Sequence, residues 1–179
     1  MPFDLSALRV LIKKIFPPKK SILTVDTTGD GKVDSIQIKA FNVVMPFVMP
    51  EEIALKDIGM KDFNGRSFNL SEYGRIILDG ENINISNEII TPESLQKRFT
   101  VYHKGERFSF DEIMVGKFGG RTVALGDTIS FLAKLEDEDL ARFTLGKHSL
   151  IIDADNIFQL EITFELNEDN TNVRFNPDS

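Results

Sequence analysis

The sequence contains no cysteine and no tryptophan, and it has two histidines among its 179 residues. Without cysteine the chain cannot form disulfides, thiolate metal sites or a thiol nucleophile. His103 and His148 each lie beside a turn signal. They are not accompanied by a serine–histidine–aspartate order, a nucleophile elbow, a zinc-protease helix or a phosphate-binding loop. We therefore expect a protein without catalytic activity of its own.

Long apolar runs are also missing, since none approaches the ~20 residues that span a bilayer. Arg9, Lys13 and Lys14 interrupt the apolar stretch that a signal peptide needs. The sequence therefore predicts no export signal and favours a cytoplasmic or virion location.

The net charge of −7 is unevenly distributed along the chain. Residues 1–20 carry +4, so the remaining residues carry −11. An acidic body disfavours nucleic acid as a partner. The basic segment in front of it predicts contact with another protein subunit, with a second copy of the chain, or with a membrane surface.

Strand-forming residues are abundant, and from Ser21 onward apolar residues alternate with a period of two. Roughly ten candidate strands follow, with turn signals between them. This pattern predicts an all-β antiparallel sandwich, of jelly-roll or immunoglobulin-like type, behind a short N-terminal amphipathic helix. We expect a helix and Pro-Pro linker at 1–20, the sandwich at 21–166 and a partly mobile C-terminal tail at 167–179.

The helix is predicted between Asp4 and Phe16, where apolar residues recur at helical spacing until Pro17-Pro18 ends the pattern. A helix of about 13 residues is marginal alone in water, so it must dock on its own domain, on a partner or on a membrane. The sequence leaves these alternatives open. The residues that would bind a partner are Leu5, Leu8, Arg9, Ile12, Lys13, Ile15 and Phe16.

The segment from Asp26 to Asp34 places three carboxylates, two threonines and two glycines close together. Over residues 26–37 it resembles the calcium loop of EF-hand proteins. The resemblance implies a calcium ion held by Asp26, Thr28, Asp30, the backbone carbonyl of Lys32, and Asp34. Two positions depart from the family pattern: Thr28 brings no charge, and Gln37 stands where the family has a bidentate glutamate.

The same segment has a second interpretation as a tight β-hairpin. A two-residue type I′ turn centred on Asp30-Gly31 would pair Val25 with Ile36, and Leu23 with Ile38. That register brings apolar residues together without any metal. Both interpretations stay open at this point.

Four short motifs follow one another through the sandwich: Gly31-Lys32-Val33, Asp79-Gly80-Glu81, Phe108 to Glu112, and Gly146-Lys147-His148. Their order resembles that of the small β-sandwich subunit of C-glycoside deglycosidases. The resemblance is one of layout and includes no specific shared motif. It implies an accessory subunit beside a catalytic partner.

These observations predict three functions. The first is a non-catalytic structural protein of a virion or other large assembly, which uses its N-terminal helix for contact with a subunit or a membrane. The second is an extracellular, calcium-assisted module that binds carbohydrate or protein. The third is the accessory enzyme subunit. Fold-level analogy alone supports the assembly setting.

Overall fold

Two sheets packed face to face form most of the computed structural model, which describes residues 5–50, 67–154 and 158–178. The longer strands are β1 (Ile22–Asp26), β2 (Ser35–Phe41), β5 (Gly74–Leu78), β8 (Phe99–His103), β9 (Glu106–Ser109), β11 (Thr128–Lys134), β12 (Gly146–Ala154) and β13 (Phe158–Leu166). The two-residue strands are β3 (Phe47–Val48), β4 (Phe68–Asn69), β6 (Glu81–Asn82), β7 (Ile89–Ile90), β10 (Thr122–Val123) and β14 (Val173–Arg174). The helices are α1 (Leu5–Ile15), α2 (Pro92–Arg98), α3 (Phe110–Met114) and α4 (Asp137–Leu140), with 3-10 turns η2 (Leu70–Glu72) and η3 (Asn84–Asn87).

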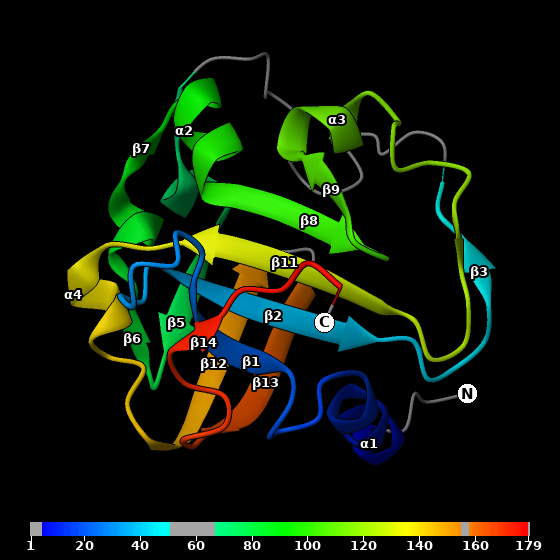
Figure 1. The fold of residues 1–179 in the computed structure, drawn as a ribbon, viewed down its shortest axis with the longest axis horizontal. Coiled ribbons are helices and arrows are strands. Elements are labelled where there is room, and N and C mark those ends of the chain that lie inside the picture. Colours follow the sequence, from blue (N-terminus) through cyan, green and yellow to red (C-terminus); the bar gives the residue numbers. More distant parts are fainter. Residues whose placement is uncertain (1–4, 51–66, 155–157, 179) are drawn as a thin grey trace.

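The larger sheet has the strand order β14-β1-β2-β11-β8-β9, and the smaller sheet has the order β13-β12-β5-β6. Neighbouring strands in both sheets are antiparallel except β1 and β14, which are parallel. Figure 1 shows the strands of the smaller sheet behind the larger sheet, crossing its strands. The predicted all-β sandwich with a short N-terminal helix is confirmed. None of the described helices is both long enough and apolar enough to cross a membrane.

The core lies between the two sheets. Leu78, Leu150 and Ile162 are register partners across β5, β12 and β13, and all three are fully buried. On the larger sheet Ile22 and Ile36 belong to the same buried cluster. Complete burial of one such side chain contributes roughly 1.5–3 kcal/mol. We call Leu78, Leu150 and Ile162 the packed row, because they are fully buried neighbours across three strands.

Local sequence signals explain several element boundaries. Thr91 caps α2, because its side chain accepts a hydrogen bond from the Ser94 N–H and the Ser94 hydroxyl accepts one from the Thr91 N–H. Lys104-Gly105 forms the tight turn between β8 and β9, with φ values of 51° and 77°. Both angles are positive, as a type I′ hairpin requires.

The C-terminal segment joins the larger sheet. Val173 pairs with Val25, and the Asn172 N–H donates to the Thr24 hydroxyl over 2.9 Å. The Asn170 side chain donates to the carbonyl of Glu165 over 2.9 Å. Figure 1 shows this segment, in red, crossing in front of the larger sheet. The predicted boundary between body and tail at residue 167 therefore falls inside a hydrogen-bonded stretch.

Candidate functional site

The Asp-rich loop connects β1 to β2. These two strands pair in a different register from the predicted one. Leu23 pairs with Gln37 and Val25 with Ser35, so the predicted pairing of Val25 with Ile36 is wrong by one residue. The connection is a long loop from Thr27 to Asp34 and not a two-residue turn. The reason is the side chain of Asp26, around which the loop closes.

The Asp26 carboxylate organises this loop as a hydrogen-bond acceptor. Its Oδ1 accepts from the N–H groups of Thr28 at 3.0 Å and Gly29 at 2.6 Å, and its Oδ2 accepts from the Gly31 N–H at 2.8 Å. The Thr28 hydroxyl adds a further contact of 3.2 Å. Gly29 and Gly31 have φ values of 80° and 86°, a conformation that glycine adopts without a steric penalty. Asp26 is 5% exposed, and both of its carboxylate oxygens accept hydrogen bonds from the loop.

These contacts set the charge state of Asp26. Burial acts to raise the pKa of this carboxyl, but the hydrogen bonds from Gly31, Gly29 and Thr28 lower it below its ordinary value of 3.8. A carboxyl whose pKa is lower in the folded chain stabilises the fold above the unfolded pKa. That stabilisation is lost as the pH falls through the folded pKa.

The other predicted calcium ligands lie in the same loop, and each is engaged by the protein. Asp34 accepts from the hydroxyls of Thr27 and Ser35, both at 2.7 Å. Asp30 accepts from the Lys32 N–H at 2.8 Å, and the Lys32 ammonium lies 2.8 Å from Asp137. In the part of the chain that the structure describes, no three histidine, aspartate or glutamate side chains converge as a metal site. Calcium binding stays a prediction of the sequence, and the following test decides it.

We expect the melting temperature to be the same in a chelator and in millimolar calcium, because a cation at Asp26 would have to displace its hydrogen-bond donors. We expect Asp26→Asn to lower the melting temperature by several degrees, since the new amide group would face N–H donors. Asp30→Asn is the matched control, because Asp30 is exposed and accepts from a single N–H. A rise in melting temperature with calcium that Asp26→Asn abolishes would establish the metal site, because a ligand of the native state stabilises it by mass action.

Helix α1 docks on its own domain. It contacts β2 and β13, and Phe16, just after the helix, packs against the core. Leu8, Ile12 and Ile15 are half-buried, whereas Arg9 and Lys13 are exposed. Leu5 is the first residue of the helix. Of the predicted partner-binding residues, Leu8, Ile12, Ile15 and Phe16 are therefore partly covered, and Arg9 and Lys13 face solvent.

A different segment carries the exposed apolar surface. We call residues 43–48 the apolar extension. Its exposed fractions are 39% for Val43, 55% for Val44, 62% for Met45, 42% for Phe47 and 61% for Val48. Figure 1 shows β3, within this segment, at the far end of the molecule from α4 and β6.

Hydrogen bonds hold the apolar extension in place. The Asn42 side chain donates to the carbonyls of Met45 at 2.8 Å and of Val123 and Ala124 at 3.0 Å. Phe47 pairs with Val123, and Val48 with Thr122, in the short β3–β10 ribbon. The exposed side chains are therefore presented on an ordered support.

A groove of about 350 Å³ runs between the apolar extension and α1. Ile15 of the helix lines it together with Val44, Met45 and Phe47. The lining is almost entirely apolar. The extension and the end of the helix thus form one continuous apolar surface.

The histidines have structural contacts. Nδ1 of His148 lies 2.6 Å from the Asp79 carboxylate, and its Nε2 lies 2.7 Å from the carbonyl of Thr144. The two ring nitrogens thus each lie within hydrogen-bond distance of one neighbour, Asp79 or Thr144. Partial burial acts to raise the pKa of Asp79, but hydrogen bonds from His148 and the Ser149 N–H hold it below its ordinary value. His103, which is buried, lies 3.2 Å from Asp127.

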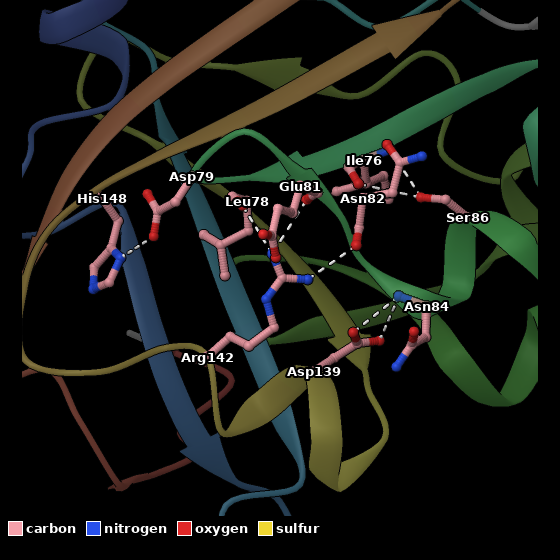
Figure 2. Close-up of polar contacts among 10 residues, drawn as sticks. All are labelled: Ile76, Leu78, Asp79, Glu81, Asn82, Asn84, Ser86, Asp139, Arg142 and His148. Atoms are coloured by element: carbon pink, nitrogen blue, oxygen red, sulfur yellow. Dashed lines mark hydrogen bonds and ion pairs between the residues drawn. The ribbon is translucent and has the colours of Figure 1, made fainter.

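Figure 2 shows a polar network that joins α4 and its following turn to the β5–β6 region. Arg142 donates to the carbonyls of Leu78, Asn82 and Glu81 at 2.8, 3.0 and 3.2 Å. The buried Asp139 carboxylate accepts from the Asn84 N–H at 2.9 Å. These contacts join the segment that contains α4 to the β5–β6 turn.

A comparison with models of protein families finds no match for this chain, and no curated protein matches its sequence. The comparisons bear on neither the calcium loop nor the layout resemblance to C-glycoside deglycosidase subunits, so both stay predictions.

Sequence reasoning missed the apolar extension. The signal was present, because residues 41–50 hold seven apolar residues, one asparagine and two prolines. Proline is confined to edge strands and turns, so such a stretch does not form a buried central strand. A strongly apolar stretch that cannot enter the core must lie at the surface.

Proposed function

We propose that this protein is a non-catalytic structural subunit that assembles with a second copy of itself through the apolar extension. The observation that carries the proposal is the set of exposed side chains from Val43 to Val48 on an ordered ribbon. Contiguous apolar patches on soluble proteins mark interaction sites, whereas scattered apolar residues do not. The setting we propose is a virion or another large assembly.

The charge of the chain favours a protein partner over a lipid surface. A net charge of −7 opposes approach to anionic membranes, because the +4 of residues 1–20 offsets only part of the −11 on the rest of the chain. Among protein partners, a second copy is favoured because most soluble oligomers are homo-oligomers with two-fold symmetry. An isologous contact would bring the extension of one chain against the extension of the other.

Two aspartates on the extension should abolish the association. We expect the double variant Val44→Asp and Val48→Asp to sediment as a monomer at concentrations where the wild type forms a larger species. Both side chains are more than half exposed, so the substitutions should leave the fold intact. Sedimentation velocity measures the species, and the unfolding midpoint verifies the fold.

The matched control is the double variant Ile89→Asp and Leu145→Asp, whose side chains are exposed at 71% and 63% outside the extension. It should associate like the wild type. If both double variants reduce association equally, general surface apolarity and not the extension is responsible, and the proposal fails. Binding of the wild type to anionic vesicles without self-association would replace it with the membrane alternative.

A further inference from the structure

A second apolar feature lies inside the sandwich. A cavity of about 290 Å³ occupies the space between the sheets. Its walls come from both sheets, from Ile83 and Leu135 next to β6 and β11, and from Phe16 after α1 and Phe110 and Ile113 of α3. The cavity is separate from the groove beside the apolar extension, because the two share no described lining residue.

The register of the smaller sheet locates the cavity beside the packed row. Ile76, Ile152 and Leu160 are register partners, two residues along each strand from Leu78, Leu150 and Ile162. Residues two apart on a strand face the same side. The packed row is fully buried, but this second row is only half-buried. The sheets therefore diverge within two residues of the packed row.

The larger sheet shows the same divergence at its centre. Phe131 lies on β11, between β2 and β8, with Ile38 and Val101 as its register partners. All three line the cavity. Phe131 is nevertheless 44% exposed. A phenylalanine on the inner face of a central strand is covered by the opposite sheet when a sandwich is closed, so this part of the interior is open to a ligand.

The lining determines what could bind. Among the described lining residues the only polar one is Thr100, and strand alternation places it on the opposite face of β8 from Val101. The described part of the wall thus offers no charge and no directed hydrogen bond to a polar molecule. A ligand would be held by burial of apolar surface and by dispersion contacts.

From these observations we infer that the sandwich interior is a binding site for a small, uncharged hydrocarbon-like ligand. The volume is about twice that of the ~150 Å³ apolar cavity that accepts benzene. It suits a molecule with two fused aromatic rings or a short alkyl chain. It is too small for a protein segment of several residues, so the inference does not depend on the proposed assembly function.

Methyl-resolved NMR with naphthalene as the probe tests the inference on the whole chain. We expect saturable shifts of the methyl groups of Ile38, Ile76, Ile152 and Leu160, together with a higher melting temperature at saturation. Shifts confined to the methyl groups of Val43, Val44 and Val48 would place the probe on the apolar extension and overturn the inference. Absence of saturable shifts would overturn it as well.

A cavity-filling variant adds a second readout. Ala133 lines the cavity between its register partners Ile36 and Phe99, so Ala133→Leu should weaken naphthalene binding by about tenfold or more. Ala7→Leu is the matched control, because Ala7 is exposed on α1. A folded Ala133→Leu variant that binds as tightly as the wild type contradicts the inference. If that variant does not fold, the wild-type methyl shifts alone decide.

Discussion

Replacing Gly74 by alanine should destabilise this protein by about 3 kcal/mol and lower its melting temperature by about 10 °C. Gly74 begins β5 and pairs with Ala154 of β12. A Cβ atom at this position would overlap the backbone carbonyl oxygen of Asp153 and lie 3.1 Å from the Ala154 Cα. Both are backbone atoms, so relief requires separation of two central strands of the smaller sheet.

Gly31→Ala is the control for this prediction. A Cβ atom on Gly31 would meet nothing within 4 Å, but the residue has a φ of 86°. Its replacement should therefore cost only the strain of the left-handed conformation, about 1 kcal/mol. Thermal unfolding of both variants gives the comparison. Equal losses of stability would show that β5 can move away from β12 at little cost, and the packing described for the smaller sheet would be wrong.

Replacing Arg142 by alanine should cost about 2–3 kcal/mol, because it removes charged donors from three backbone carbonyls at once. The carbonyls belong to Leu78, Glu81 and Asn82, around the tight turn of β5 and β6. Figure 2 shows the guanidinium reaching into this turn from the segment after α4. Without the guanidinium, the turn and Leu78 of the packed row lose these hydrogen bonds.

Arg75→Ala is the matched control for Arg142→Ala. The Arg75 guanidinium lies 2.8 Å from the Asp153 carboxylate, but its side chain is half exposed. Exposed ion pairs contribute about 0–1 kcal/mol, so this variant should unfold close to the wild-type midpoint. Chemical denaturation of both variants measures the difference. An Arg142→Ala variant as stable as Arg75→Ala would mean that the three carbonyls do not depend on the guanidinium.

The fold class was predictable because period-two alternation and turn signals are local. The Lys104-Gly105 turn and the Thr91 cap, for example, depend only on residues close together in sequence. The register of β1 and β2 was not predictable, because it depends on the four hydrogen bonds that the Asp26 side chain accepts. Apolar pairing alone favoured the register shifted by one residue.

The candidate site could not be predicted in full for a similar reason. The amphipathic helix was predicted correctly. It packs against β2 and β13, and no local sequence pattern reveals where a helix docks. The exposed surface lies instead on residues 43–48, where two non-local contacts, from Asn42 and from β10, hold the ribbon away from the core. The cavity depends on how far two sheets diverge, which is a property of the whole sandwich.

The central claim is that the apolar extension of one chain meets the apolar extension of another. Because the sequence has no cysteine, a single introduced cysteine reports on this contact without interference. Oxidation of Val44→Cys, Met45→Cys and Val48→Cys, each as a single variant, should yield a covalent species of twice the 20.2 kDa chain mass from at least one of them. A disulfide forms only where two Cα atoms come within about 7 Å.

Leu145→Cys, with a similarly exposed side chain outside the extension, serves as the reference for random collision. Our account predicts rapid cross-linking on the extension at concentrations where Leu145→Cys stays monomeric. Cross-linking of all the extension variants no faster than that of Leu145→Cys would contradict it.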